Sequence, residues 1–233
     1  KALELDPTNL KAWAYRAAAK ADLGQLAGAI EDASKAIELD PTLADCYLTR
    51  MRCRARLPDY PGCIADCDKL IELKPDDHEG WYFRGYLRCR VQRKMEAGLA
   101  DFKKAVEIDP RNARLRLDRA TIYFELTNDR AALEDVNAAI GVEPRNAFGH
   151  NLKGLILMRS SDPKGALASL SRAVELSPDD ITIRTNRMVC RARAGDFEAA
   201  ERDVAEILKL KPDFSQVWQQ LASGEMEAGA YER

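Results

Sequence analysis

The chain has 233 residues, of which 46% are hydrophobic, 32% charged and 7% aromatic. This apolar content is enough for a continuous core and excludes wholesale disorder. The net charge is -2, from 36 Lys and Arg against 38 Asp and Glu, so no global basic excess points to nucleic acid. No apolar run approaches the ~18 residues of a membrane span. No signal peptide is visible, and because the first residue is not Met we expect the natural chain to begin earlier.

Prolines recur along the chain with a period of 34 residues, which lengthens once to 35. They are Pro7, Pro41, Pro75, Pro110, Pro144, Pro178 and Pro212. The residues before them repeat as well, for example AIELDP at 36–41 and AVEIDP at 105–110. A fixed period of this length indicates an array of structural repeats.

Each period contains two helical patterns. The first helix carries a face with i, i+3, i+4, i+7 spacing, which in the first period is Trp13, Arg16, Ala17 and Lys20. After a turn at 23–25, one face of the second helix is marked by Ala29, Ala33 and Ala36. Proline then ends the second helix. Side chains that can cap the next helix stand at Asn9, Asp77, Asn112, Asn146 and Asp180.

These residues resemble the tetratricopeptide repeat family, whose pattern is Trp-x2-Leu-Gly-x2-Tyr, then Ala-x3-Phe, then Pro. The third period fits it well, with one extra residue in its turn, through Trp81, Gly85, Phe102, Ala105 and Pro110. The resemblance implies an all-α fold, a right-handed α-solenoid of stacked helix-turn-helix repeats that spans 1–233 as a single solenoid. The six full repeats are expected at 10–43, 44–77, 78–112, 113–146, 147–180 and 181–214.

Partial repeats are expected at the two ends. Residues 1–9 resemble the end of an earlier second helix, and 215–233 a seventh first helix followed by a turn over most of 224–229. In that helix Trp218, Leu221 and Ala222 continue the packing positions of the earlier first helices. We therefore expect a piece of a longer protein, monomeric or weakly associated end to end.

The family's leucine position is basic in every full repeat: Arg16, Arg50, Arg84, Arg119, Lys153 and Arg187. One turn into the second helix stand Asp32, Asp66, Asp101, Asp135, Ser169 and Asp203. The Asp is replaced only where the Arg has become Lys. This internal co-variation predicts an Arg–Asp pair within each hairpin, the alternative being two unrelated solvated sets of charges.

The family resemblance places the first helices on the concave side of the solenoid, where a partner would bind. An apolar cluster is expected there, formed by Tyr82, Tyr86, Phe124, Phe148, Leu155 and Met158. Beside it we expect Asn151 and basic residues at Arg52, Arg56, Arg90, Arg159 and Arg193. Aromatic anchors with arginine around them are typical of interface hot spots, although the apolar residues could equally pack one first helix on the next.

Charge is segregated between the two kinds of helix. The six predicted first-helix segments hold 21 Lys and Arg against 5 Asp and Glu. Part of this excess belongs to the predicted Arg–Asp pairs, and the remainder favours a partner with acidic character. A plain solvated face is the alternative.

No pattern of catalytic residues is recognisable. The six cysteines form no CxxC motif, and Cys63 and Cys67 occupy small core positions, so we expect reduced thiols and neither a metal nor a cofactor. Their spacing fits a reducing, intracellular and cytoplasmic compartment. His150 occupies the packing position of Trp13, which favours a core role over a catalytic one.

The function expected is a scaffold or adaptor, not an enzyme, that holds a peptide or helix of a partner protein in the concave groove. Some family members bind acidic chaperone tails with Lys and Asn at the positions of Ala14 and Ala18, a pair that no repeat here carries; only Asn186 matches a clamp position. Single-stranded RNA stacked on Tyr82 and Tyr86 is the alternative, although nearby acidic residues disfavour nucleic acid. A regulatory region of a larger enzyme is the third possibility. No membrane partner is expected.

Overall fold

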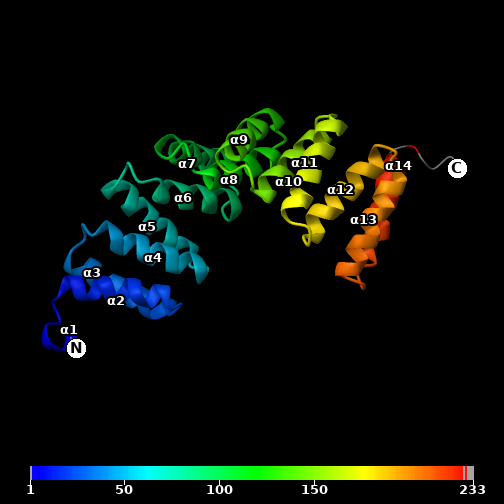
Figure 1. Ribbon diagram of the computed structural model, residues 1–233. Helices are drawn as coiled ribbons and strands as arrows, with labels where there is room; N and C mark the ends of the chain where they lie inside the picture. Colours follow the sequence, from blue (N-terminus) through cyan, green and yellow to red (C-terminus); the bar gives the residue numbers. More distant parts are fainter. Residues whose placement is uncertain (1, 228, 230–233) are drawn as a thin grey trace. The chain divides into compact units, whose positions relative to one another are not determined.

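The structure is a computed structural model that describes residues 2–227 and residue 229. Within them all regular secondary structure is helical, in fourteen helices (Figure 1). The helices are α1 (Ala2–Leu5), α2 (Leu10–Asp22), α3 (Leu26–Leu39), α4 (Ala44–Arg56), α5 (Tyr60–Leu73), α6 (His78–Arg90), α7 (Met95–Ile108), α8 (Ala113–Glu125), α9 (Asp129–Val142), α10 (Ala147–Arg159), α11 (Pro163–Leu176), α12 (Ile181–Arg193), α13 (Phe197–Leu210) and α14 (Gln216–Glu227).

The contacts divide the chain into two units, a first unit Lys1–Pro110 and a second unit Arg111–Arg233. In each unit, consecutive helices pair as hairpins, α2 with α3 in the first unit and α8 with α9 in the second, for example. The second helix of a hairpin then packs on the first helix of the next hairpin in the same unit, as α3 does on α4. The expected all-α architecture of stacked helical hairpins is thereby confirmed.

The helices begin where the sequence places capping side chains. All five predicted caps accept a hydrogen bond from a backbone N–H in the first turn, as the Asn9 side chain does from Ala12 at 3.0 Å. The second helices have caps that the sequence analysis did not single out, at Asp59, Asn128, Asp162 and Asp196. In the fourth, fifth and sixth hairpins both helices begin with a side-chain cap, which fixes where each helix starts.

The first-helix residues aligned with Trp13 fasten each first helix to the turn before it. The side chains of Trp13, Trp81, His150 and Arg184 each donate to the carbonyl of the proline six residues earlier, at 2.8 to 3.0 Å. His150 does so through Nε2, but it is only partly buried, so it attaches the helix to the turn and is not enclosed in the core as predicted. The same position therefore serves one purpose with three different side chains.

Glycine allows the third hairpin to close tightly. A Cβ on Gly85 in α6 would lie 2.9 Å from the carbonyl oxygen of Gly98 in α7, and a Cβ on Gly98 would meet the Cys89 sulfur at 2.2 Å. Both distances are shorter than van der Waals contact, so the two backbones approach at a position where only glycine fits. The extra residue predicted in this hairpin's turn is present, since α6 ends at Arg90 and α7 starts at Met95.

The last helix is longer than predicted. Residues 224–227 were expected in a turn, but α14 continues through them to Glu227. The helix is held by tertiary packing, because Gly224 lies where a Cβ would be 2.9 Å from Cβ of Ala192 in α12. Of the expected packing residues Leu221 is buried, whereas Trp218 is 53% exposed and Val217 is buried in its place. Ala228 lies outside the described residues.

Candidate functional site

Each hairpin that has both predicted partners contains an Arg–Asp pair, which confirms the co-variation argument. The closest nitrogen–oxygen distances are 2.6 Å for Arg16–Asp32, 2.7 Å for Arg50–Asp66, 2.7 Å for Arg84–Asp101, 2.6 Å for Arg119–Asp135 and 2.5 Å for Arg187–Asp203. The five aspartates are 1 to 3% exposed. Two N–H groups of the guanidinium donate to the two carboxylate oxygens, as Nε and Nη2 of Arg16 do to Asp32. This bidentate geometry also fixes the helix–helix register.

A second cation, which sequence reasoning missed, reaches each of these aspartates. Four lie one helical turn after the paired arginine: Lys20, Arg54, Arg88 and Arg191. In the fourth hairpin Tyr123 occupies that position, and Arg116 meets Asp135 at 3.2 Å instead. The signal was present in the sequence as basic residues at i and i+4 on one helix, where a single carboxylate can satisfy both.

Asp32 keeps its charge to a lower pH than an ordinary carboxyl group. Burial raises the pKa of Asp32, but hydrogen bonds from Arg16 and Lys20 outweigh that effect and hold its pKa below the ordinary value. Much of the basic excess of the first helices is therefore neutralised inside the hairpins. The charge left on the surface is smaller than the sequence count suggests.

In the first unit the same arginines also connect neighbouring hairpins. Arg50 donates to the Ser34 hydroxyl at 2.9 Å and Arg84 to the Asp68 carboxylate at 2.6 Å, in both cases on the second helix of the preceding hairpin. Arg16 belongs to the first hairpin, and its side chain is 46% exposed. The side chains of Arg50 and Arg84 are each 14% exposed. Arg16 is thus the most exposed of these three arginines.

The fifth hairpin lacks the ion pair, as predicted. The Ser169 hydroxyl donates to the carbonyl of Gly165 at 2.9 Å, within its own helix. Among the described residues Lys153 forms no salt bridge with an acidic side chain. Gly154 packs tightly here instead, since a Cβ at that position would lie 2.5 Å from Leu170.

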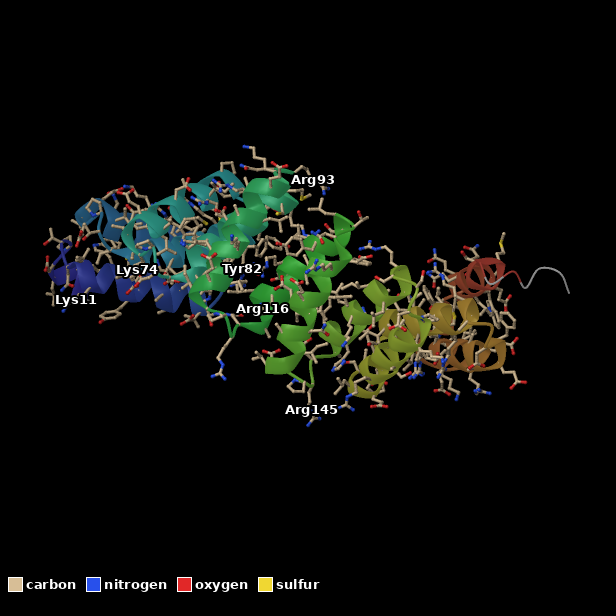
Figure 2. All side chains as sticks on the ribbon, turned by 90° about the horizontal axis from the view of Figure 1, so that it is seen from above. Lys11, Lys74, Tyr82, Arg93, Arg116 and Arg145 are labelled. Carbon is tan, nitrogen blue, oxygen red and sulfur yellow. The ribbon has the colours of Figure 1, made fainter. Side chains whose placement is uncertain are left out.

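The predicted binding residues lie on the first helices of both units, and each unit is described separately. In the first unit Tyr82 of α6, which is labelled in Figure 2, is part of the buried core. Its ring centroid lies 5.1 Å from that of Phe83 and 5.9 Å from that of Phe102. Tyr86 is 41% exposed and is the accessible member of the tyrosine pair.

The basic residues predicted in the first unit differ in their surroundings. Arg52 donates to Glu79 at 3.0 Å, which links α4 to α6. Arg56 is exposed at the end of α4, and Arg90 is partly buried at the end of α6. The exposed face of this unit is therefore mixed in charge.

The second unit contains a polar cluster on adjacent first helices. Asn186 of α12 donates to the side-chain oxygen of Asn151 of α10 at 2.9 Å. Asn151 is 8% exposed, and so is its neighbour Thr185, whose hydroxyl is buried without a hydrogen-bond partner. A buried hydroxyl without a partner costs free energy, so Asn151 and Thr185 differ from the other buried residues of α10 and α12, which are apolar or glycine. Asn151 was predicted as a binding residue from the sequence, whereas its hydrogen bond with Asn186 was not.

Apolar residues and arginines continue along the same two helices. Leu155 and Met158 of α10 are partly buried, whereas Phe148 at its start is 50% exposed. Arg159 lies with its guanidinium carbon 3.9 Å from the ring centroid of Phe124 and forms an ion pair with Asp129. Phe124 is therefore covered by Arg159, and the pair joins α10 to α8 and α9.

A pocket of about 300 Å³ lies between the α10–α11 turn and the end of α12. It is lined by Met158, Ser161, Pro163, Cys190 and Arg193. Burial raises the pKa of the Cys190 thiol, so the sulfur in this pocket is neutral. Two of the predicted binding residues, Met158 and Arg193, thus line one pocket within the second unit.

All six cysteines are buried free thiols. Cys63 and Cys67 occupy the predicted core positions at 0% exposure. A hydrogen bond from Cys67 lowers the pKa of Cys63, and the same bond, with burial, raises the pKa of Cys67. Over the described residues, the structure contains no group of three His, Cys, Asp or Glu side chains that could hold a metal ion. No helix in the same part of the chain is long and apolar enough to cross a membrane.

Comparison with known families identifies the repeats. Tetratricopeptide repeat models match residues 10–43, 117–181 and 157–223. A protein prenyltransferase alpha subunit repeat model matches 61–91, a shorter segment that covers α5 and α6. Together with the stacked hairpins, these matches show that the chain belongs to the tetratricopeptide repeat family. No curated protein matches this sequence.

Solved structures share the fold at low sequence identity. PilW, a type IV pilus biogenesis factor, is 14% identical, with 91% of this chain and 98% of that chain covered and a TM-score of 0.78. YrrB, a TPR protein with an unusual peptide-binding site, is 18% identical, with 78% and 94% covered and a TM-score of 0.66. MamA from Desulfovibrio magneticus RS-1 is 16% identical, with 74% and 97% covered and a TM-score of 0.67. At these identities the likeness is one of fold.

Proposed function

We propose that this protein is a non-enzymatic scaffold that binds an extended segment of a partner protein on its first helices. The observation that carries this proposal is the polar cluster of Asn151, Thr185 and Asn186. A peptide backbone carries one donor and one acceptor per residue, and an Asn side chain offers both kinds of group. Asn186 is only partly buried, so its side chain is the accessible member of the cluster.

The surroundings of the cluster support a peptide ligand. Leu155 of α10 and Val189 of α12 are partly buried beside it, so they offer apolar contact to side chains of the segment. Repeat proteins of this kind present long surfaces because each repeat contacts only its neighbours. YrrB, which shares the fold, is described as having a peptide-binding site. These features favour recognition of a chain segment over recognition of a small molecule.

Single-stranded RNA receives less support than a protein segment. The RNA alternative needs two accessible stacking rings, but Tyr82 is buried in the first unit. Arg52, which would meet phosphate, is already engaged by Glu79. Electrostatic binding to nucleic acid weakens steeply with salt, so titration of a fluorescent RNA oligonucleotide at two salt concentrations is the direct check.

The proposed function is tested by affinity purification with quantitative mass spectrometry. We expect the wild-type protein to enrich a reproducible set of proteins that the Asn151→Ala/Asn186→Ala double variant loses. The matched control is Asn137→Ala, since Asn137 is exposed on α9, a second helix. If the double variant remains folded by circular dichroism and retains the full set, the polar cluster does not bind the partner.

A further inference from the structure

Exposed aliphatic side chains recur at one edge of the first unit. Leu23, Leu57 and Val91 are the residues that directly follow α2, α4 and α6, and they are 74%, 44% and 42% exposed. Because the hairpins stack, the turns after these three helices lie at the same edge of the unit (Figure 1). A single exposed leucine is ordinary on a protein surface, whereas aliphatic residues that recur in successive turns indicate a contact surface.

Three basic side chains lie next to two of these residues along the chain. Arg56 precedes Leu57, and Arg93 and Lys94 follow Val91 in the turn between α6 and α7, where Figure 2 labels Arg93. All three basic side chains are exposed. Within the part of the chain that the structure describes, none of the three forms an ion pair or a side-chain hydrogen bond. We call Arg56, Leu57, Val91, Arg93 and Lys94 the basic edge.

The turn between α6 and α7 differs from the other hairpin turns. It is one residue longer, and Lys94 stands directly before α7, where Asp or Asn caps α5, α9, α11 and α13. Arg93 has φ 57°, in the left-handed region that Gly24 and Gly195 occupy in the turns before α3 and α13. The backbone would favour glycine and a capping side chain here, so it gives no reason for two cations. Insertions in repeat proteins often lie in loops of the binding face.

We propose that the basic edge binds an acidic segment of a partner protein. Asp or Glu side chains of the segment meet Arg56, Arg93 and Lys94, and an apolar side chain packs on Leu57 and Val91. This surface is independent of the polar cluster of α10 and α12, because it lies in the first unit. It therefore adds a second binding surface to the proposed scaffold.

Charge complementarity identifies the partner as acidic. Asp59, which follows Leu57 by two residues, is neutralised by Arg54 at 3.1 Å. Glu96, exposed in the first turn of α7, is the other carboxylate near this turn. Unpaired cations therefore exceed unpaired carboxylates, and a negative segment is attracted.

The composition of the basic edge favours a protein segment over other anions. Single-stranded nucleic acid is bound with aromatic rings that stack on bases, and residues 56–58 and 91–94 contain no aromatic residue. Anionic membranes are recognised by clusters of about 4–8 Lys or Arg, more than this edge provides. Aliphatic side chains among a few cations fit a protein segment that carries both carboxylates and an apolar residue.

A random-peptide phage library selected against the purified protein tests this inference. We expect wild type to enrich peptides in which an apolar residue lies among two or more Asp or Glu residues. In fluorescence anisotropy titrations, these peptides should bind Arg93→Glu/Lys94→Glu about tenfold more weakly, because two exposed attractions become repulsions.

Arg93→Gly separates binding from folding. The substitution removes the cation but suits the positive φ of this turn, so the thermal unfolding midpoint should not fall. Binding of the selected peptides should nevertheless weaken. The matched control is Thr127→Gly, which relieves the equivalent turn of the fourth hairpin and should leave peptide binding unchanged.

The outcomes distinguish this inference from the proposed function. If every selected peptide binds Arg93→Gly and Arg93→Glu/Lys94→Glu as tightly as wild type, the inference is wrong. If the peptides instead lose affinity only for Asn151→Ala/Asn186→Ala, they bind the polar cluster and the basic edge is not their site. Loss at the basic edge alone supports this inference, whatever the fate of the polar cluster.

Two further probes examine the other anions. Poly(U) RNA and vesicles of phosphatidylcholine with phosphatidylserine should not bind in a manner that depends on Arg93 and Lys94. If either probe does so while no acidic peptide is selected, the occupant is not a protein segment and the inference is overturned. A wild-type selection that enriches no peptide over an unrelated protein contradicts it as well.

Discussion

Asp66 is 1% exposed and lies between the guanidinium groups of Arg50 and Arg54. Removing one member of a buried ion pair typically costs about 3–5 kcal/mol, because the remaining charge stays buried without compensation. Replacing the whole arrangement with apolar packing can be nearly neutral. The fifth hairpin, with Lys153 and Ser169, shows the chain using a structure without the pair.

The fifth hairpin should accept the pair when both partners are restored together. Ser169→Asp alone buries a carboxylate beside Lys153 and should destabilise the protein by about 1–3 kcal/mol. In the Lys153→Arg/Ser169→Asp double variant, the two side chains can adopt the bidentate geometry of the other hairpins, so most of that loss should be recovered. Urea unfolding of the wild type, both single variants and the double variant gives the coupling free energy.

Additive losses in this cycle would contradict the prediction. They would mean that the tight contact between Gly154 and Leu170 prevents the fifth hairpin from adopting the spacing of the others. An equivalent cycle on Arg187 and Asp203, which are already paired at 2.5 Å, supplies the reference coupling.

The lowered pKa of Asp32 predicts a specific acid sensitivity. A carboxyl whose pKa is lower in the folded than in the unfolded state, where it is about 3.9, adds stability above that pH. The contribution is lost as the pH falls through the folded-state value. The free energy of unfolding of wild type should therefore decline below about pH 4 more steeply than that of Asp32→Asn. Parallel pH profiles would show that the pair contributes nothing to acid stability; Asp22→Asn, an exposed position, is the control.

At the scale of single helices, the period of the prolines and the cap residues sufficed to predict the hairpins. These signals are local, because a proline or a cap acts on the turn in which it stands. The incorrect prediction of a turn at 224–227, where α14 continues, arises from a tertiary contact and not from a local signal. Gly224 is a poor helix residue on its own, but its lack of a side chain admits Ala192, and that tertiary contact could not be inferred from local pattern.

The candidate site was harder to predict than the helices. Tyr82 stands at a position that elsewhere in the chain holds Leu48 or Leu117, and the spacing does not reveal that its ring reaches Phe102. The pocket also depends on the α10–α11 turn, which brings Ser161 and Pro163 beside the end of α12. The periodicity predicts the residues that share one face of a helix. It does not predict the residues of that face that remain accessible, because accessibility depends on side-chain packing.

The hairpin turns predict a pair of opposite stability changes. Gly24 and Thr127 occupy equivalent turn positions at φ +74° and +57°. This region suits glycine and strains a β-branched residue. We expect Gly24→Ala to destabilise the protein by about 1 kcal/mol, through the backbone alone, because a Cβ there meets nothing within 4 Å. Thr127→Gly should stabilise it by up to about 1 kcal/mol.

Thermal and urea unfolding measure both changes. The turn between α10 and α11 provides a further comparison, since Ser161 has φ +60° without β-branching. Ser161→Gly should therefore gain less than Thr127→Gly. Equal effects of all three substitutions, in sign and size, would indicate that backbone strain in these turns does not limit stability.

For the molecule as a whole, the ion pairs change how the sequence charge is interpreted. The first helices are strongly basic, but five of their arginines face buried aspartates of the second helices. The charge left at the surface of the first helices is therefore smaller than the sequence count suggests, and it includes exposed residues such as Arg56. The proline period runs without interruption past Pro110, so it could not indicate the division of contacts into two units there.

Self-association through the flank of the first hairpin is the prediction that concerns the whole molecule. This flank contains a pocket of about 510 Å³ lined by residues that include Trp13, Arg16 and Ile30. In later hairpins the corresponding arginine is covered, and in the first unit it donates to the preceding second helix. We expect weak, concentration-dependent association, measured by sedimentation equilibrium, that Ile30→Lys reduces.

If the contact is head to tail, Trp218→Ala should reduce it as well, because Trp218 is 53% exposed at the other end of the hairpin series. Head-to-tail contacts of this type do not close and can grow into open chains. A constant monomer mass at all concentrations, for wild type and both variants, would show that the exposed flank does not bind a second copy.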